Sequence, residues 1–555
     1  MSEPKPSEQV EPSSSAASSF PKKNKVDVNV HDLESYTEEL EEIDDYIFGA
    51  DKNLSRGLKQ RHIQMLTLVG VFGTGLFLSS RRTLHLTGNV GMILSYLFIG
   101  VLVGLNQLAM IEISCLMPVT GSYIRHGEHF VDGAFSFALG WVGIYSSIIP
   151  SEFSATALIM RYWSDLNPAV WVTVFLAIII VCNCWKVRFY GEIEFFFGIL
   201  KILLILGLII FSLVMDLGGV KGVDRIGFRY WKETPFREYY TDGGVGRFLS
   251  WWKASGSVVY AYGGVAGISY YAGETQNPRH SIYTAGKRIF FRVFGFYMLT
   301  VFGLTLILSA ENPQIANSTG DSTGSPFVIA IKDAGIKGLP SIINVIVLTS
   351  AFSASNLGVM LSSRNLFALA AKGQAPQFFL KTNRFGLPYV AVIVSIGFMP
   401  LAYMNASSGA ATVFGWFQSI TSANLLVTWI AISINHISLQ KALKAQGYSR
   451  EDLPYKMPFA HIGAYISLFG FSLLLLTGGY HNFLKGNFDV SSFISSYFVI
   501  PLYAFLFFLW KFWKKTKIRK SSEVDLVSLF RHVKENPETI PGRHHGWRMV
   551  KYLWE

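Results

Sequence analysis

Two apolar stretches of this chain carry more glycine than a regular helix tolerates. The first, residues 66–80, reads LTLVGVFGTGLFLSS. A glycine inside a helix costs about 1 kcal/mol relative to alanine, so three glycines in six residues favour local unwinding. An unwound segment releases backbone amides at the start of the following half-helix, where they attract a carboxylate. The residues expected to present these groups are Gly73, Thr74, Gly75 and Leu76.

The second stretch, residues 260–274, reads YAYGGVAGISYYAGE and is interrupted in the same way. Carbonyl groups at the end of its first half would face a cation. Amides from one break and carbonyls from the other suit the carboxylate and ammonium groups of an amino acid. Small residues that merely allow close helix packing are the alternative explanation. The residues expected at this second break are Tyr260, Ala261, Tyr262 and Val265.

Two charged residues lie deep inside apolar stretches, where an ionisable side chain indicates function by default. Lys201 is placed about 15 Å from the nearer end of its helix, too deep for its side chain to reach water easily. Glu152 is placed about 12 Å deep. Either residue could exchange a proton during transport. A structural ion pair for Lys201 and a polar packing role for Glu152 are equally compatible with the sequence.

Other polar residues have less specific interpretations. Glu112 is expected at a helix end, solvated or acting in gating, and Glu274 is expected to cap or gate the second broken helix. Glu192 and Glu194 are placed at a helix start, where acids suit the helix dipole, with no role in transport. Ser353 and Asn356 could face a substrate cavity or bond a neighbouring helix. A later helix offers similar groups at Ser419, Thr421, Ser422 and Asn424.

These residues must be positioned by membrane helices. Half of the 555 residues are hydrophobic, 15% are charged, and the mean hydropathy is +0.34. This composition excludes a soluble enzyme, a disordered chain or a nucleic-acid binder. Spanning a bilayer takes about 20 apolar residues. The stretches of that kind number twelve, approximately at 63–80, 88–111, 134–160, 169–185, 190–215, 247–273, 288–310, 340–371, 388–406, 410–436, 460–480 and 493–513.

The two glycine-rich spans are the first and the sixth, so they lie five spans apart. An odd offset places the two halves of the bundle in opposite orientations, which is typical of transporters built from inverted repeats. Basic residues gather in the loops that are inside when both termini are cytoplasmic, and this pattern favours that orientation. In this orientation, two glycosylation sequons, at Asn317 and Asn405, lie in loops on the outer side of the membrane, which is weak support for it.

The chain divides into three segments by composition. Residues 1–55 are predicted to be a disordered, Ser-rich and acidic cytoplasmic tail, and residues 516–555 a cytoplasmic tail that lies against the membrane domain. Residues 56–515 hold the spans. The three cysteines lie in apolar stretches, which argues against a disulfide framework. We find no motif for a metal site, a cofactor or a membrane enzyme in the spans.

The order of several short motifs resembles the fungal-type amino-acid permeases of the amino acid–polyamine–organocation superfamily. The resemblance covers about residues 56–515 and is carried by LKQRHIQM, GTGLF, PVTGSY, FALGW, AGE-x-x-NPR-x-S-I, SAFSASN, SSRNLFALAAKGQAPQFF and GLPYVAV. It implies twelve helices, with a 5+5 inverted repeat, broken helices 1 and 6 and two further C-terminal helices. It also implies uptake of amino acids driven by protons at the plasma membrane.

By this resemblance, the helix 1 residues bind the substrate carboxylate, and Tyr262 gates the substrate. Lys201 and Glu152 take part in proton coupling. Lysines of the N-terminal tail would accept ubiquitin through ligase adaptors. The chain departs from the family at residues 264–266, which read Gly-Val-Ala where the family usually has Gly-Thr-Glu. A transporter-like amino-acid sensor with little or no transport is the alternative, and the amino acid carried stays open.

Overall fold

The computed structural model describes residues 47–49, 71–148, 151–183, 187–265, 267, 269, 272, 275, 277–316, 325–384, 386–408 and 410–538. Every regular element in this part of the chain is a helix. Six helices are long and apolar enough to cross a bilayer alone, and α19 (Val490–Tyr497) with α20 (Val499–Lys514) makes a seventh span bent by 45°. The remaining predicted spans correspond to shorter or interrupted helices.

The twelve predicted spans can be followed in order through the structure. The first is the π-helix η2 (Gly75–Ser79) with the start of α3 (Ser80–Leu116), whose remainder is the second. The other spans are α5 (Gly133–Ile148) with α6 (Ser151–Met160), α7 (Pro168–Asn183), α8 (Val187–Asp216), the broken span that starts with α10 (Gly243–Ala261), α11 (Pro278–Ile307), α14 (Leu339–Ala371), α15 (Tyr389–Ile396) with η6 (Met399–Met404), α17 (Ala410–Ala445), α18 (Ala460–Thr477), and α19 with α20.

The first two spans are joined by a sharp turn rather than by a loop. Gly88 in α3 has φ +78°, and a Cβ atom there would lie 2.9 Å from the carbonyl oxygen of Thr234. The connection between α9 (Arg229–Glu233) and α10 packs into this turn, where the Asn89 amide donates to Thr234 O at 3.1 Å. Only glycine combines this backbone angle with such a close approach.

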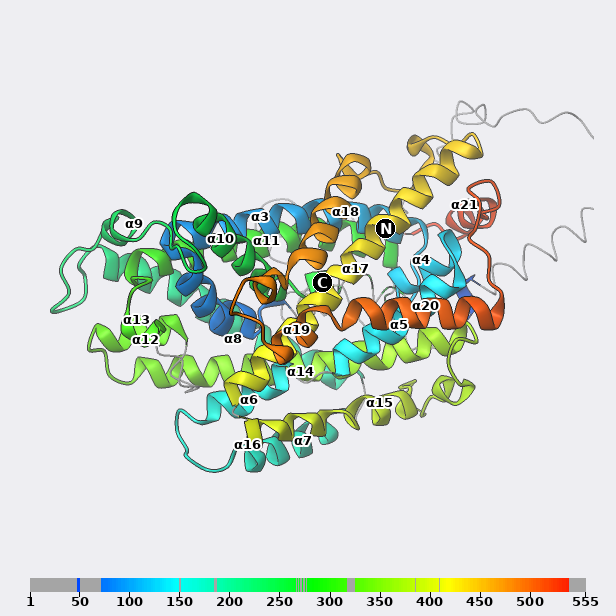
Figure 1. Cartoon of the computed structure of the whole chain (residues 1–555). Helices are drawn as coiled ribbons and strands as arrows, with labels where there is room; N and C mark the ends of the chain where they lie inside the picture. Colours follow the sequence, from blue (N-terminus) through cyan, green and yellow to red (C-terminus); the bar gives the residue numbers. More distant parts are fainter. Residues whose placement is uncertain are drawn as a thin grey trace, which may run out of the picture.

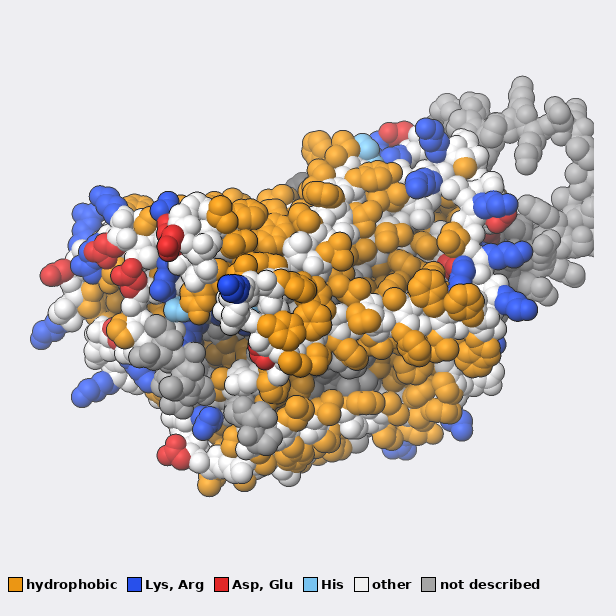
Figure 2. Space-filling view, viewed as in Figure 1, with side chains coloured by type: hydrophobic (Ala, Val, Ile, Leu, Met, Phe, Trp, Pro, Cys, Tyr) orange, Lys and Arg blue, Asp and Glu red, His pale blue; other side chains and the backbone are white. Residues whose placement is uncertain are grey.

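The molecule has an apolar waist between two polar ends. Helices α9, α12 (Pro313–Ala316) and α13 (Pro326–Asp333) lie at one end, and α4 (Tyr123–Phe130) and α21 (Val527–Glu535) lie at the other (Figure 1). Hydrophobic side chains cover the surface between these ends, and charged side chains gather mostly at the ends (Figure 2). Ile210, Phe469 and Phe505 are more than 60% exposed. Such a surface suits lipid rather than water.

The chain after α20 crosses the end of the bundle that holds α4. We call residues 516–538 the C-terminal strap. Its Arg519 amide donates to Val131 O at 2.9 Å, and His129 in α4 bonds Asp525 O at 2.9 Å. The ring of His532 stacks on Phe48, 3.7 Å between centroids. The strap therefore lies against the membrane domain as the sequence indicated, whereas residues 1–46 and 539–555 are outside the described part of the chain.

The strap also caps α11, the helix that follows the second glycine-rich break. The carboxylate of Glu538 accepts from the amides of Arg279 at 2.8 Å and His280 at 2.7 Å. The Arg279 side chain returns a bond to Asn536 O at 2.8 Å. Amides in the first turn of a helix lack partners within the helix, and an acid satisfies them and the helix dipole together.

We expect mild acidification to loosen the strap. Burial, together with Arg519 and Lys372, lowers the pKa of His129 to about 4, and Asp525 opposes this shift. Because the pKa with the strap bound is below the ordinary value, the docked strap prefers neutral imidazole. Its stability is complete above about pH 6.5 and falls as the pH drops toward 4, by about 2 kcal/mol between pH 7 and 5.

Hydrogen exchange of residues 516–538 at pH 7 and pH 5, corrected for the intrinsic rate, measures this effect. The variant His129→Gln should show no such change between the two pH values. Equal protection of the strap at both pH values in the unmodified protein would contradict the expectation.

Candidate substrate and coupling site

The first glycine-rich stretch is irregular where the sequence predicts it. The chain bends at residues 72 and 73 before η2 begins at Gly75. The Thr74 amide donates to the carboxylate of Glu152, at 3.3 Å from Oε1 and 3.2 Å from Oε2. Leu76 is buried in η2. A backbone amide at the break thus donates to a side-chain carboxylate in the bundle interior.

The second glycine-rich stretch interrupts its helix as well. Helix α10 ends at Ala261, and Gly264 has φ +86°. Of the residues that follow, the structure describes Val265, Gly267, Ser269 and Ala272 in short 3-10 turns, whereas Ala266 and Glu274 lie outside the described residues.

The two breaks touch each other. A Cβ atom on Gly75 would lie 2.5 Å from Ala261 Cα, so only glycine permits this approach of the backbones. The hydroxyl of Tyr297 in α11 lies 2.8 Å from Val71 O and 2.7 Å from Ala261 O, so it bridges the carbonyls of both breaks. Tyr297 could not be predicted from the sequence, since no pattern distinguishes it from other aromatic residues of α11.

Glu152 and Tyr260 form the polar centre between the breaks. The Tyr260 hydroxyl donates to Glu152 Oε1 at 2.8 Å and lies 3.3 Å from Thr74 Oγ1. It also contacts Ser151 Oγ at 3.2 Å. A Cβ atom on Gly73 would lie 2.6 Å from Glu152 Oε1, so this glycine makes room for the carboxylate. Glu152 at the start of α6 therefore reaches the helix 1 break directly.

A cavity of about 160 Å³ lies at this centre. Apolar cavities of that size hold a molecule such as benzene, so a small amino acid is within range. Among the described lining residues, Glu152 is the only acid or base apart from the phenol of Tyr260. The lining comprises Val71, Gly73, Gly75, Ser151, Glu152, Phe153, Tyr260, Gly263, Gly264, Ala354, Ser355, Leu357, Gly358, Val359, Leu361, Ser395, Met399, Thr421 and Leu425.

Several predicted binding residues lie outside this lining. The hydroxyl of Tyr262 donates to Tyr96 O at 3.1 Å, so its ring packs toward α3 rather than over the cavity. Val265 is buried beside the break without lining the cavity. In α14, Ser355 lines the cavity, whereas Ser353 and Asn356 face α8. The structure thus selects Tyr260 over Tyr262 and Ser355 over its polar neighbours.

Lys201 and Glu194 form a second buried cluster with α14. The ammonium of Lys201 is 3.3 Å from Ser353 Oγ, and the Ser353 hydroxyl donates to Glu194. Asn356 Nδ2 donates to the same carboxylate at 3.4 Å. Both charged side chains are fully buried. The interpretation of Glu194 as an acid at a helix start is therefore wrong, because α8 begins at Val187 and packs this residue against α14.

Glu112 is buried rather than solvated at its helix end. Its carboxylate accepts from Arg450 Nη2 at 2.7 Å and from the Met457 amide at 3.1 Å. His436 and Gln440 of α17 complete the cluster at 3.2 and 2.9 Å. Glu112 thus joins α3 to α17 and to the segment before α18, so the expectation of a solvated helix end is wrong.

Of the two predicted glycosylation sites, the structure describes only Asn405. Asn317 lies outside the described residues. The side chain of Asn405, at the start of α16 (Asn405–Ser408), is 2% exposed. A buried amide cannot be presented to a glycosyltransferase in the folded protein, so the expectation for Asn405 is corrected.

Paired breaks that flank a cavity in an all-helical bundle define a membrane transporter of the broken-helix class. A family model described as amino acid permease matches residues 62–523. The dicarboxylic amino acid permease of Saccharomyces cerevisiae is 38% identical over 88% of this chain and 82% of that protein. The proline-specific permease of Emericella nidulans is 36% identical over 85% and 88%. The chain therefore belongs to the amino acid permease family.

A solved structure supports the fold alone. The manganese transporter of Eremococcus coleocola superposes with a TM-score of 0.50 at 12% identity, covering 82% of this chain and 94% of that one. With the family established, the predicted class, a helical multi-pass transporter rather than an enzyme, is confirmed. The amino acid carried and the coupling ion do not follow from family membership.

We expect Gly75→Ala to reduce amino-acid uptake at least tenfold. The added methyl group would lie 2.5 Å from Ala261 Cα, and backbone rather than a flexible side chain would have to move. Overpacking of this kind costs about 1–3 kcal/mol, and 1.4 kcal/mol is a factor of ten. Gly207→Ala in α8 is the matched control, because nothing lies within 4 Å of its added methyl group.

Both variants are measured by labelled uptake in a permease-deficient cell, normalised to the amount of protein at the membrane. If the two variants transport equally well, the close approach of the breaks is not needed for function.

Proposed function

We propose that the protein is a proton-coupled amino-acid symporter that works by alternating access. The observation that carries this proposal is the Glu152 carboxylate on the Thr74 amide, between the two breaks. It is an acid within reach of the place where a substrate carboxylate would bind. Protons are therefore the natural coupling ion, and the cavity is the natural substrate site.

Competition for one backbone amide explains how the proton and the substrate would be coupled. The carboxylate of Glu152 and that of an amino acid need the same hydrogen-bond donors at the helix 1 break. Two carboxylates also repel each other in a low-dielectric site. Protonation of Glu152 weakens its hold on the Thr74 amide and removes the repulsion. Substrate then binds best after a proton has bound, which is the requirement for a symporter.

The driving force of one proton is sufficient. A membrane potential of 100 mV contributes about 2.3 kcal/mol per charge. A difference of one pH unit contributes about 1.4 kcal/mol. Together they support an accumulation of several hundred-fold, roughly, for a neutral amino acid.

Lys201 has a supporting role in this proposal. Its buried ammonium interacts electrostatically with Glu152 and with Glu194. Ser353 joins it to Glu194, so the cluster links α8 to α14 close to the cavity. A fixed cation at this place can substitute for a coupling sodium ion and balance the acid that gains and loses the proton.

The cellular setting belongs to the same proposal. The distribution of basic loop residues supports cytoplasmic termini, and the family supports the plasma membrane as the location. Ubiquitin-ligase adaptors acting on Lys22, Lys23 or Lys25 are then possible partners. The named relatives differ in substrate, one dicarboxylic and one proline-specific, so the class of amino acid needs its own argument.

We expect Glu152→Gln to abolish proton-driven accumulation while exchange of internal for external substrate persists. The amide oxygen still accepts hydrogen bonds from Thr74 and Tyr260, but the side chain no longer takes up a proton. Accumulation should fall at least tenfold and become insensitive to a protonophore. Glu233→Gln is the control, since Glu233 in α9 is exposed and pairs only with Arg229 at 3.9 Å.

Accumulation and counterflow are measured with labelled amino acids in a permease-deficient cell. Protonophore-sensitive accumulation by Glu152→Gln would show that another group carries the proton. A complete lack of uptake by the unmodified protein would favour the sensor.

We expect Lys201→Met to uncouple or abolish uptake. Removing the ammonium also leaves Glu194 buried without a counter-charge, which costs about 3–5 kcal/mol. The double variant Lys201→Met/Glu194→Gln removes both charges and should restore the amount of protein at the membrane. Uptake should stay low in the double variant. Normal proton-driven uptake by that variant would exclude a coupling role for Lys201.

A further inference from the structure

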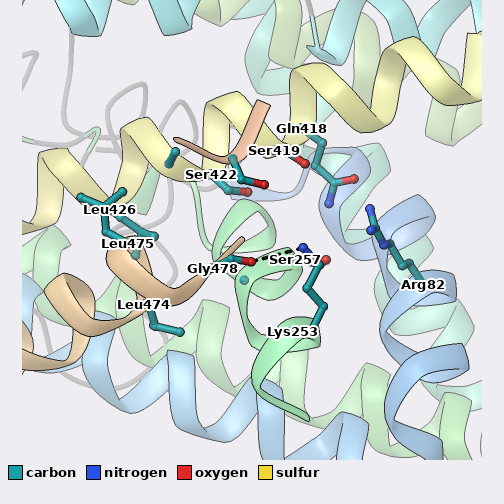
Figure 3. A pocket seen from close by; sticks show the side chains of 13 residues that line it. Arg82, Lys253, Ser257, Gln418, Ser419, Ser422, Leu426, Leu474, Leu475 and Gly478 are labelled. Carbon is teal, nitrogen blue, oxygen red and sulfur yellow. Dashed lines mark hydrogen bonds between the residues drawn. The ribbon is translucent and has the colours of Figure 1, made fainter. Parts of the chain in front are cut away.

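A second cavity, of about 60 Å³, is lined by a different set of residues (Figure 3). It is enclosed by α3, α10, α17, α18 and α19. Arg82 and Lys253 supply two cations, and Gln418, Ser419 and Ser422 supply polar groups. In the view of Figure 3, the side chains of Arg82, Lys253 and Gln418 turn toward the same space. The described residues that line it include no acid.

These two cations have no counter-charge in the described part of the chain. Lys253 donates to Gly478 O at 3.2 Å and to His481 Nδ1 at 2.9 Å, both of which are neutral partners. Arg82 is exposed and forms neither an ion pair nor a hydrogen bond with any described residue. By contrast, its neighbour Arg81 bonds the carbonyls of Gln314 and Ile315.

The pKa of the neighbouring His481 is affected by both basic side chains. Burial, together with Lys253 and Arg82, lowers the pKa of His481 to about 3, while Asp489 opposes the shift. The imidazole is therefore neutral at ordinary pH and can accept the bond from Lys253. An uncompensated positive field in a cleft with low-dielectric walls concentrates anions.

This cavity and the substrate cavity are lined by neighbouring residues of the same two helices. Ser257 lines the positive cavity, and Tyr260, three residues later on the same side of α10, lines the substrate cavity. Gln418 and Thr421 stand in the same relation on α17. Three residues correspond to about 4.5 Å of helix. Gln418 also donates to Ser79 at 2.9 Å, which joins the wall to the first span.

The position along the bundle indicates the route of entry. Lys253 is ten residues from the start of α10 at Gly243 and eight from its end at Ala261. The start of α10 and the end of α18 face away from the C-terminal strap (Figure 1). With the strap in the cytoplasm, the positive cavity lies between the outside medium and the substrate cavity.

We propose that Arg82 and Lys253 form an anion-selective entry site and that acidic amino acids are the preferred substrates. This inference rests on the proposed function. An acidic amino acid carries one negative charge more than a neutral one, and that second carboxylate is the group the two cations attract. Cationic amino acids are repelled at the same place. A positive entry increases the rate of association of an anion by tenfold or more, roughly.

The test compares Arg82→Gln with Arg81→Gln. Labelled glutamate uptake is measured in a permease-deficient cell, with glutamate, alanine and lysine as competitors. We expect unmodified protein to take up glutamate and to be inhibited most strongly by acidic competitors. Arg82→Gln should raise the ratio of KM for glutamate to the inhibition constant for alanine about tenfold. Arg82→Lys should retain the ratio, and Arg81→Gln should leave it unchanged.

The outcomes separate this inference from the proposed function. Uptake of neutral or cationic amino acids without uptake of glutamate would overturn the inference and leave the symporter proposal standing. Glutamate uptake with an unchanged ratio in Arg82→Gln would also overturn it. Absence of uptake for any amino acid would instead overturn the proposed function. Lys253→Gln serves as a second variant, with its amount at the membrane measured, because Lys253 also bonds Gly478 and His481.

Discussion

A backbone amide that lacks an acceptor is costly inside a bilayer, and this site is arranged around the acceptor of one amide, that of Thr74. The Thr74 amide lies at the glycine-rich break and donates to a side chain of another span. Glu152 supplies this acceptor, and Tyr260 supplies a donor to the same carboxylate. Gly73 is needed because any side chain there would occupy the place of the carboxylate oxygen. The acceptor of this one amide thus constrains the residues at Gly73, Glu152 and Tyr260.

Helix α11 links the site to the C-terminal strap at the far end of the molecule. Tyr297 contacts the carbonyls of Val71 and Ala261, so α11 is bonded to both breaks at once. The first turn of α11 is capped by Glu538 of the C-terminal strap. A helix behaves as a nearly rigid rod over this length, so a shift of α11 would move its contacts with both breaks together. One helix, α11, therefore joins the strap to the two breaks, although no described strap residue lines the cavity.

Sequence alone could predict the spans and the breaks because both follow from local composition. It could not predict which side chains face the cavity. Successive residues of a helix are rotated by about 100° around its axis, so the direction of each side chain depends on how the helix packs against its neighbours. Tyr260 and Tyr262 are both aromatic, yet only Tyr260 reaches Glu152. Ser353 was expected either at the substrate cavity or on a neighbouring helix, and it lies against Glu194 of α8. The contact of Lys201 with Ser353 could not be predicted either, because it depends on how α8 and α14 pack.

The two cavities carry side chains of opposite charge, and this difference suits them to different roles. An acid at the bottom of the path suits a proton, since it can be neutralised there and does not need a counter-ion in the neutral state. Arg82 at the entrance cannot be neutralised so readily, because its guanidinium keeps its charge at any ordinary pH. Such a cation therefore recognises a charge on the incoming molecule instead of storing one. If Arg82 and Lys253 sort the substrate by its side chain, the breaks need to recognise only the groups that all amino acids share. This would let closely similar inner sites serve relatives that carry different amino acids.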